Sequence, residues 1–421
     1  MSEIIINGTA RLEGALDVQG SKNSSLPILA ACVLVDGVSV LHNCPFLSDV
    51  DAAVAILEHL GCVVKREGHT LTVDSRGVSC YNIPEQLMRE MRSSIVFLGS
   101  LVSRLSRAKV FSPGGCEIGL RPIDLHLSSL RALGLSIEQR EGALFCEAKN
   151  GLAGTTVSLS FPSVGATENI ILASVFAKGR TTVLNAAREP EIEDLARFLN
   201  KCGCRVHVGS HGTVVIDGVK KAHGTEHTII PDRIVALTYM SAVAACGGDV
   251  LFKNVDTSHF LSVLGVFENA GCIIEDEKSS IRLISDGRLH AVRDIRTMPY
   301  PGFPTDAQAP VTAMLCTAGG TSVIVENIFE NRFNHVGELV RMGADIKVEG
   351  RVAIVNGVPS LHGAHVLAVD LRAGSALVVA ALKAQGETVI SGVGHIDRGY
   401  EKIEDCLKSL GASIERSAES G

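Results

Sequence analysis

The sequence repeats one unit six times, and this repeat restricts the possible folds more than any other feature of the 421 residues. In each copy a helical run ends on a glycine, and a short stretch rich in β-forming residues follows. The six glycines are Gly61, Gly134, Gly203, Gly271, Gly343 and Gly411. Their spacing of roughly 70 residues is long for a solenoid, so we expect each copy to be a small α/β layer with a hairpin that needs the other copies to bury a core.

Two kinds of helix are predicted in each repeat. The helix before the glycine is amphipathic, with apolar residues such as Val50, Val54 and Leu57 on one face of a 3.6-residue helix. The other helix is apolar on nearly all sides and therefore has to be enclosed by protein. The enclosed helices are predicted at 26–35, 95–102, 170–177, 235–246, 311–318 and 376–384.

The N-terminal segment has no repeat of its own. Residues 3–18 are predicted to form a strand pair, whereas the last repeat stops at Glu415 without the second strand of its hairpin. Segments 7–15 and 356–364 share the pattern Asn-Gly, then Leu five residues after Asn, then Gly-Ala. We therefore predict that the N-terminus completes the final repeat, which makes the domain with the C-terminus discontinuous.

Composition narrows the class of protein. With 46% apolar residues the chain can bury sizeable cores, while 4% aromatics without Trp weigh against a stacking platform for single-stranded nucleic acid. A net charge of −7 argues against a general polyanion binder. The twelve cysteines include no CxxC pair, which favours reduced core thiols over disulfides or a zinc site. Since no apolar run is long enough for a bilayer and the start lacks a signal-peptide pattern, we expect a soluble cytoplasmic protein without a membrane partner.

Polar and charged residues gather where the enclosed helices begin. These are Lys22 and Asn23, Arg92, Ser163 to Gly165, Asp232 and Arg233, Thr305 and Asp306, and Asp370 to Arg372; nearby loops add Arg121, Arg188, Arg332 and Arg398. Helix N-termini are natural anion sites. Lys22, Arg121, Arg332, Arg372 and Arg398 could therefore converge on a small, highly charged anion, although each alone could also be a solvated or salt-bridged charge.

The loop at 112–126 departs most from its counterparts in the other repeats. It reads SerProGlyGlyCysGluIleGlyLeuArgProIleAspLeuHis. Its glycines permit backbone mobility that a packing loop does not need. Cys116 on such a loop is available for proton transfer or covalent chemistry. The alternative is that Cys116 is one ordinary cysteine among twelve.

Motifs in order along the whole chain point to one family. They lie at 21–23, 91–95, 113–116, 121–126, 163–167, 186–192, 303–308, 329–333, 370–373 and 395–402, among them ProGlyGlyCys, PheProThrAspAlaGln and HisIleAspArgGlyTyrGluLys. Together they resemble the UDP-N-acetylglucosamine 1-carboxyvinyltransferase family of enolpyruvyl transferases. One departure is Val96, where a Trp is common in the family, and it puts the packing near Arg92 in question.

The resemblance implies a particular α/β architecture. It consists of two inside-out α/β barrel domains, each of three repeated βαβαββ units with enclosed helices and outer sheets. One domain would span 22–229 and carry the Cys116 loop, the other would combine 1–21 with 230–421, and the active site would lie in the cleft between them. Two chain crossings make closure on substrate a plausible hinge motion.

The resemblance also implies a reaction. Enolpyruvyl passes from phosphoenolpyruvate to the 3-hydroxyl of UDP-N-acetylglucosamine and phosphate is released, by addition–elimination through a tetrahedral intermediate, as the first committed step of peptidoglycan precursor synthesis. Cys116 matches the acid, which can form a covalent adduct with phosphoenolpyruvate, and Asp306 matches the base. A helix N-cap is the alternative role for Asp306, and both roles can hold. No cofactor, metal or nucleic acid is implied.

The remaining matches concern substrate binding. Lys22, Arg121, Arg332, Arg372 and Arg398 match phosphoenolpyruvate contacts, with Lys22 and Arg398 also counted as catalytic. Asn23, Arg92, Asp124, Leu125, Ser163, Val164, Gly165 and Ile328 match contacts to the nucleotide sugar, and Pro122 and Ile123 are assigned to substrate binding with them. For Leu125, Val164 and Ile328 a packing role fits equally well. Asp370 is close enough in sequence to orient Arg372.

Three alternatives remain open from the residues alone. A transferase acting on shikimate 3-phosphate would share the repeats and much of the cation cluster but lacks the cysteine loop. A ring-shaped clamp also uses six α/β units, yet its inner helices must be basic to face DNA, whereas these are apolar. A cysteine hydrolase would need a base for Cys116, and His126 is the nearest histidine in the sequence.

Overall fold

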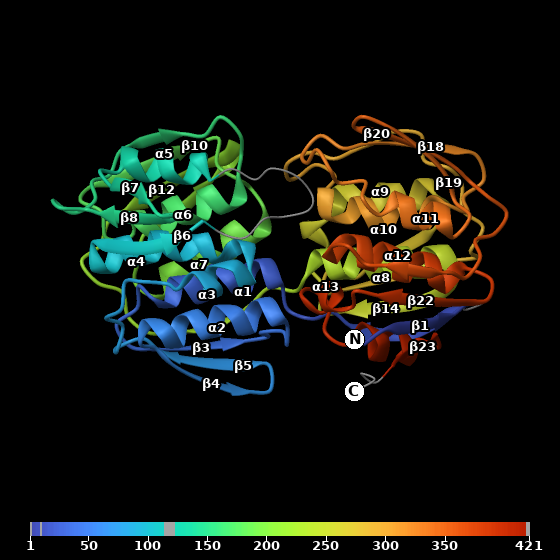
Figure 1. Cartoon of the computed structure of the whole chain (residues 1–421), viewed down its shortest axis with the longest axis horizontal. Coiled ribbons are helices and arrows are strands. Elements are labelled where there is room, and N and C mark those ends of the chain that lie inside the picture. The colour runs from blue at the N-terminus through green and yellow to red at the C-terminus, as the bar shows by residue number, and fades with distance from the viewer. Residues whose placement is uncertain (1, 9–10, 113–122, 418–421) are drawn as a thin grey trace. The chain divides into compact units, whose positions relative to one another are not determined.

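The computed structural model describes residues 2–8, 11–112 and 123–417. The chain divides into two compact units, whose helices and strands are labelled in Figure 1. The middle unit comprises the described residues between Gly20 and Ile230, and the terminal unit comprises those up to Gln19 and from Pro231 onward. Each unit has its own hydrophobic core.

The middle unit contains three sheets, with strand orders β13-β3-β5-β4, β6-β8-β7 and β11-β12-β10-β9. Its helices are α1 (Lys22–Cys32), α2 (Ser48–Leu60), α3 (Glu85–Glu90), the 3₁₀-helix η1 (Arg92–Val96), α4 (Phe97–Leu105), α5 (Asp124–Ala132), α6 (Val164–Ser174), α7 (Pro190–Lys201) and the 3₁₀-helix η2 (Ser210–Gly212). Its strands are β3 (Val38–His42), β4 (Val63–Glu67), β5 (Thr70–Asp74), β6 (Arg107–Phe111), β7 (Ser136–Arg140), β8 (Ala143–Glu147), β9 (Thr156–Ser158), β10 (Arg180–Leu184), β11 (Val206–Gly209), β12 (Thr213–Asp217) and β13 (Glu226–Thr228).

The terminal unit also contains three sheets, ordered β21-β22-β1-β23, β15-β16-β14-β2 and β17-β18-β20-β19. Its helices are α8 (Arg233–Cys246), the 3₁₀-helix η3 (Thr257–His259), α9 (Leu261–Asn269), α10 (Thr305–Leu315), α11 (Val336–Arg341), α12 (Leu371–Lys383), α13 (Gly394–Asp397) and α14 (Ile403–Ser409). Its strands are β1 (Ile4–Asn7), β2 (Leu12–Asp17), β14 (Gly248–Lys253), β15 (Ile273–Asp276), β16 (Ser280–Ser285), β17 (Ile295–Arg296), β18 (Thr321–Val325), β19 (Asp345–Glu349), β20 (Val352–Asn356), β21 (His365–Leu367), β22 (Glu387–Ser391) and β23 (Ser413–Arg416).

The repeated glycines end helices as the sequence predicts. All six have φ between 87° and 104°, a left-handed region that costs other residues energy but glycine little. An antiparallel hairpin follows each of the first five, formed by β4 and β5, β7 and β8, β11 and β12, β15 and β16, and β19 and β20. The predicted repeat of helix, glycine and hairpin is therefore confirmed for these five copies.

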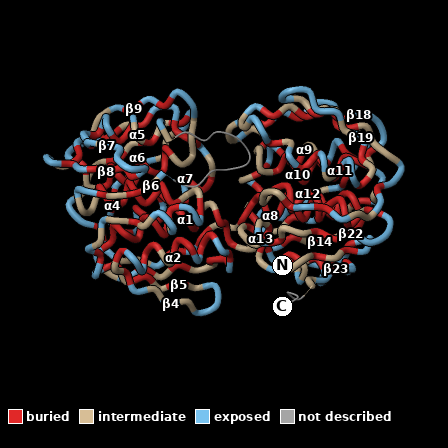
Figure 2. Tube along the Cα trace, in the orientation of Figure 1, coloured by how far each residue is buried: buried red, intermediate tan, exposed pale blue. Residues whose placement is uncertain are grey.

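The enclosed helices are confirmed as well. They correspond to α1, α4, α6, α8, α10 and α12, which run mostly in the colour of buried residues in Figure 2. Several begin before their apolar run: α1 starts at Lys22 because the side chain of Ser21 caps it, accepting from the backbone N–H of Ser24 at 3.3 Å. Lys22 and Asn23 thus lie in the first helical turn. None of the helices in the described part of the chain is long and apolar enough to cross a membrane.

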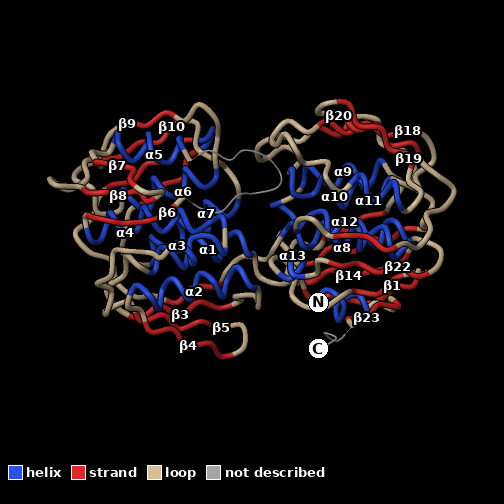
Figure 3. The backbone as a smooth tube through the Cα atoms, in the orientation of Figure 1, coloured by secondary structure: helices blue, strands red, loops and turns tan. Residues whose placement is uncertain are grey.

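Strand β1 completes the last repeat, as predicted. It lies between β22 and β23, antiparallel to both, in the place that β5 takes in the sheet β13-β3-β5-β4. Figure 3 shows these strands together in the terminal unit. The predicted strand pair within 3–18 is wrong, because β1 uses both of its edges on β22 and β23. Strand β2 instead pairs in parallel with β14 of another sheet.

Free thiols are found at the eleven cysteines that the structure describes, and most of these are buried. Burial raises the pKa of Cys44 and of Cys316 to about 12. Such thiols carry little thiolate near neutral pH and are unreactive. The prediction of reduced core thiols is confirmed for these cysteines, while Cys116 lies outside the described residues.

Because β1 lies in the middle of its sheet, we expect that shortening one of its buried side chains strongly lowers the stability of the terminal unit. Ile6 is 0% exposed, so Ile6→Ala should lower the free energy of unfolding of the terminal unit by about 2 to 5 kcal/mol, measured by urea denaturation. Ile273→Ala is the matched control, since Ile273 lies on a strand of the same unit and is 59% exposed. The control should change stability by no more than about 0.5 kcal/mol. Equal losses would mean that β1 is not a structural centre of this unit.

Candidate active site

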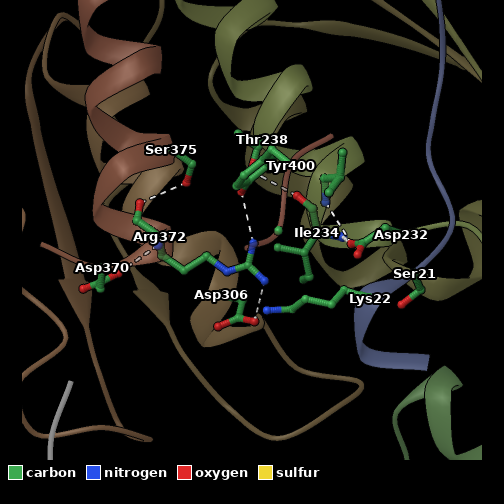
Figure 4. A network of polar contacts seen from close by, with 12 residues as sticks. Ser21, Lys22, Asp232, Ile234, Thr238, Asp306, Asp370, Arg372, Ser375 and Tyr400 are labelled. Carbon is green, nitrogen blue, oxygen red and sulfur yellow. Dashed lines mark hydrogen bonds and ion pairs between the residues drawn. The ribbon is translucent and has the colours of Figure 1, made fainter. Parts of the chain in front are cut away.

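The carboxylate of Asp306 binds two arginines of the terminal unit, Arg332 and Arg372. Figure 4 shows the contact with Arg372. Asp306 lies in the first turn of α10, Arg332 in the segment between β18 and α11, and Arg372 in the first turn of α12. Arg332 donates to Oδ1 of Asp306, and Nη2 of Arg372 donates to Oδ2 at 2.9 Å. Both arginine side chains are buried, 4% and 7% exposed, whereas Asp306 is 28% exposed. The structure thus brings together the residue that matches the base and two that match phosphoenolpyruvate contacts.

The alternative role of Asp306 as an N-cap is wrong. The N-cap of α10 is Pro304, which has no side-chain capping bond. Asp306 is the second residue of the helix, and its carboxylate oxygens accept hydrogen bonds from the two guanidinium groups.

Arg372 is held at both ends of its guanidinium group. Nη2 binds Asp306, and Nη1 donates to the hydroxyl oxygen of Tyr400 at 3.1 Å. Burial lowers the pKa of Arg372, but the charges of Asp306 and the interactions with Tyr400 and Asp232 outweigh it and raise the pKa above its ordinary value. Arg372 therefore stays a cation in a buried place.

Asp370 acts on the helix rather than on the guanidinium of Arg372. Its Oδ1 accepts from the backbone N–H groups of Arg372 and Ala373 at 2.8 and 2.9 Å. This is an N-cap, which fixes where α12 begins. The predicted orienting role of Asp370 is therefore corrected to one exerted through the backbone.

Glu326 joins the start of α10 to the segment that carries Ile328 and Arg332. It directly follows β18 and is buried. Its carboxylate accepts four hydrogen bonds of 2.8 to 3.0 Å, from the hydroxyls of Thr297 and Thr305 and from the backbone N–H groups of Ile328 and Phe329. A buried carboxylate with this many donors is well satisfied and rigid.

Arg398 ends α13, and Tyr400 follows two residues later. The backbone N–H of Tyr400 donates to the carbonyl of Ile396 at 3.0 Å, so this segment continues as a helical turn. Arg398 is half-buried. Its side chain is carried by the same turn that places Tyr400 against Arg372.

Lys22 in the middle unit is paired with an acid that the sequence analysis did not single out. Its Nζ donates to Oδ2 of Asp49 in α2 at 3.0 Å, and both side chains are buried. A buried ammonium group needs such a partner. Asn23 follows Lys22 in the first turn of α1.

Several residues that match nucleotide-sugar contacts surround His126 in α5. Nδ1 of His126 accepts a hydrogen bond from Nδ2 of Asn169 at 2.8 Å. Burial lowers the pKa of His126 to about 4, with a further lowering by Arg92 and an opposing effect of Asp124. A Cβ on Gly165 would lie 3.1 Å from the His126 ring, so glycine suits this approach. Arg92, Asp124 and Gly165, which are distant in sequence, thus meet near one neutral imidazole.

The other matches divide into three groups. Ser163 is the N-cap of α6 and accepts from the backbone N–H of Ala166 at 3.4 Å. Ile123, Leu125 and Val164 pack against the core of the middle unit. Cys116, Arg121 and Pro122 lie outside the described residues.

Comparison with known proteins identifies the family. A family model described as EPSP synthase (3-phosphoshikimate 1-carboxyvinyltransferase) matches residues 6–407. The chain belongs to this family. Within the family it is 51% identical over 416 residues to UDP-N-acetylglucosamine 1-carboxyvinyltransferase 2 of Caldanaerobacter subterraneus subsp. tengcongensis, covering 99% of this chain and 100% of that protein. It is 47% identical to UDP-N-acetylglucosamine 1-carboxyvinyltransferase 1 of Symbiobacterium thermophilum, covering 98% and 94%. The resemblance inferred from the motifs is confirmed.

Solved structures share the α/β fold of this family member. The enolpyruvyl transferase NikO from Streptomyces tendae superposes with a TM-score of 0.89 at 24% identity, over 99% of both chains. An EPSP synthase from Acinetobacter baumannii gives a TM-score of 0.75 at 18% identity, over 99% of this chain and 100% of that one. At such identities the likeness establishes the fold alone. The clamp and cysteine hydrolase alternatives gain no support, and an imidazole with the pKa of His126 is a weak base for a thiol.

Three polar residues of this family member were missed by sequence reasoning. Asp49 looks like any solvated acid in the first turn of an amphipathic helix, so the sequence gives no signal for it. Glu326 is a charge directly after an apolar run, and Tyr400 is one of only four tyrosines, two residues after Arg398. The last two features could have marked buried polar groups, though not their partners.

The low pKa of His126 predicts a pH dependence of stability. The folded state keeps the ring neutral down to about pH 4, whereas the ordinary value is 6.5, so between these values the unfolded state binds more protons. The contribution of His126 to stability is therefore present above pH 6.5 and is lost as the pH falls toward 4. Between about pH 7 and about pH 4.5 the wild-type chain should lose roughly 2.5 kcal/mol more stability than His126→Gln, as measured by urea denaturation of the middle unit.

Glutamine keeps an acceptor for Asn169, so the variant tests the proton and not the hydrogen bond. His207→Gln is the control, because His207 is exposed on β11 of the same unit, and it should behave as the wild type. Parallel loss in His126→Gln and the wild type would show that His126 does not titrate on unfolding.

Proposed function

We propose that the chain transfers the enolpyruvyl (1-carboxyvinyl) group of phosphoenolpyruvate to the 3-hydroxyl of UDP-N-acetylglucosamine and releases phosphate, the first committed step of peptidoglycan precursor synthesis. The observation that carries this proposal is the identity of 46 to 51% over nearly the whole chain to proteins named for that activity. The shikimate 3-phosphate reaction is the second candidate, because the matching family model bears that name.

In the proposed reaction, side chains of the protein accept and donate the protons that move. The 3-hydroxyl oxygen attacks C2 of phosphoenolpyruvate and gives its proton to Asp306, while Cys116 donates a proton to C3, which yields the tetrahedral intermediate. Elimination then returns a proton from C3 to the Cys116 thiolate and breaks the bond from C2 to the phosphate oxygen, so the double bond returns. The leaving phosphate takes the proton from Asp306. A covalent adduct at Cys116 remains part of this proposal.

The binding roles are proposed residue by residue. Lys22, Arg121, Arg332, Arg372 and Arg398 hold phosphoenolpyruvate, and Asn23, Arg92, Asp124, Leu125, Ser163, Val164, Gly165 and Ile328 contact the nucleotide sugar, together with Pro122 and Ile123. Buried guanidinium groups such as that of Arg372 suit a carboxylate or phosphate because their charge is little screened there. We also propose that the units are inside-out α/β barrels of three repeats each and that the protein is cytoplasmic.

The direct test is a mixing experiment. The chain is incubated with phosphoenolpyruvate and UDP-N-acetylglucosamine, with each substrate alone, and with phosphoenolpyruvate and shikimate 3-phosphate. Phosphate release that requires both phosphoenolpyruvate and the nucleotide sugar supports the proposal. Release with shikimate 3-phosphate instead would replace it by the second candidate.

The base role of Asp306 is tested by Asp306→Asn. The amide keeps the size of the side chain but cannot take a proton, so turnover should fall about 10²- to 10⁴-fold. Labelling of Cys116 by the epoxide fosfomycin, which does not use the sugar hydroxyl, should persist and is followed by peptide mapping. Asp294→Asn is the control, since Asp294 is exposed and pairs with Arg296 in the same unit. Near-normal turnover of Asp306→Asn would place the base elsewhere.

A further inference from the structure

Tyr400 is buried and packs against Arg372, and it has no role in the proposed reaction as described so far. Its side chain is among the largest fully buried ones, at 1% exposure. The centre of its ring lies 5.9 Å from the guanidinium carbon of Arg372, and its hydroxyl contacts Arg372 and Thr238. Figure 4 shows Tyr400 and Thr238 on the side of Arg372 away from Asp306.

The direction of each proton in this chain of hydrogen bonds follows from the donors available. Arg372 can only donate, so the Tyr400 oxygen accepts at 3.1 Å. Thr238 donates its single hydroxyl proton to the backbone carbonyl of Ile234, one turn earlier in α8, at 3.1 Å. In the 2.8 Å contact between the two hydroxyls, Tyr400 is therefore the donor and Thr238 the acceptor. The hydrogen bonds therefore run from Arg372 through Tyr400 and Thr238 to Ile234, and both hydroxyl protons are used.

This polarity leaves a lone pair of the Tyr400 oxygen directed at Arg372. The guanidinium is planar, so contacts at Nη1 to Tyr400 and at Nη2 to Asp306 fix its plane at two points. The hydrogen bond to Asp306 involves a partly exposed carboxylate, whereas the hydrogen bond to Tyr400 is buried. The buried hydrogen bond to Tyr400 therefore fixes the orientation of the guanidinium group.

The backbone around Tyr400 is held on both sides. The side-chain amide of Gln19 donates to the carbonyl of Gly399 at 3.2 Å and accepts from the N–H of Glu401 at 2.8 Å. Tyr400 also closes the helical turn from Ile396 that includes Arg398. One clamped segment therefore carries Arg398 and sets the orientation of Arg372.

We propose that Tyr400 is a positioning residue of the anion site: its hydroxyl, polarised by Thr238, orients the Arg372 guanidinium for the carboxylate or phosphate of phosphoenolpyruvate. The identity of that anion rests on the proposed function above. The ring itself packs the core, so the hydroxyl is the part that serves the site.

The test compares Tyr400→Phe with Tyr239→Phe. Both changes remove one hydroxyl from a buried tyrosine of the terminal unit, but the hydroxyl of Tyr239 lies near Cys406. Tyr400→Phe should raise KM for phosphoenolpyruvate about tenfold and leave KM for UDP-N-acetylglucosamine within about twofold, because a charged donor loses its acceptor. Tyr239→Phe should leave both constants at wild-type values. A hydroxyl with a merely structural role would change the melting temperature of Tyr400→Phe without this split between the two substrates.

Variants of Thr238 test this chain of hydrogen bonds. Thr238→Ser keeps the acceptor for the Tyr400 proton and should keep wild-type constants, whereas Thr238→Val removes it and should raise KM for phosphoenolpyruvate as Tyr400→Phe does. Normal KM values in both Tyr400→Phe and Thr238→Val overturn the inference. If neither the wild type nor Tyr239→Phe releases phosphate from the two substrates, the proposed function is wrong. If both release phosphate and Tyr400→Phe has the same KM values as they do, only the positioning role is wrong.

Discussion

Enclosure of helices that have no polar face is the constraint on which this structure depends. All fourteen residues of α8 are buried, and α6, α10 and α12 are nearly so. Such helices can present polar groups only at their ends, where the first backbone N–H groups lack partners within the helix. Ser21, Ser163, Asp232 and Asp370 cap these ends. Residues proposed to bind substrate follow directly after several of the caps, so the packing of these helices also determines where the proposed site lies.

In the first turn of α10, the acid Asp306 faces two buried cations, Arg332 and Arg372. Burial works against the charge of Arg372, and Asp306 is the main group that restores it. A substrate carboxylate or phosphate would offer the arginines the same ligand chemistry that Asp306 supplies in this structure. Under the proposed function, the acid that accepts the proton is therefore also the counter-ion of the binding site, and binding and proton transfer are linked through the same guanidinium groups.

The local features of this fold could be read from the sequence, whereas the polar contacts could not. Neighbouring residues determine three features: the glycine at a left-handed position, the hairpin that follows it and the helix without a polar face. These features were predicted correctly. The place of β1 in the last repeat was predicted because segment 7–15, which begins at its last residue, resembles segment 356–364. The position of β2 was not, because it depends on which strand edges are already occupied. The N-cap role of Asp306 failed since Arg332 and Arg372 lie 26 and 66 residues away. Tyr400 and Thr238 are separated by 162 residues, a pairing that no local pattern reveals.

The place of β1 also bears on how the chain folds as it is synthesised. Strand β1 precedes the other described strands along the chain, yet its partners are Glu387 to Ile390 and Ser413 to Arg416. At about 5 to 20 residues per second, roughly 20 to 80 s pass before both partners exist. During this time Ile4, Ile5 and Ile6 lack the partners that cover both edges of β1 in the folded chain, and an unpaired apolar strand is a known template for aggregation. The middle unit has no such dependence on β1, so a nascent chain can complete that unit while the terminal unit still awaits its last strand.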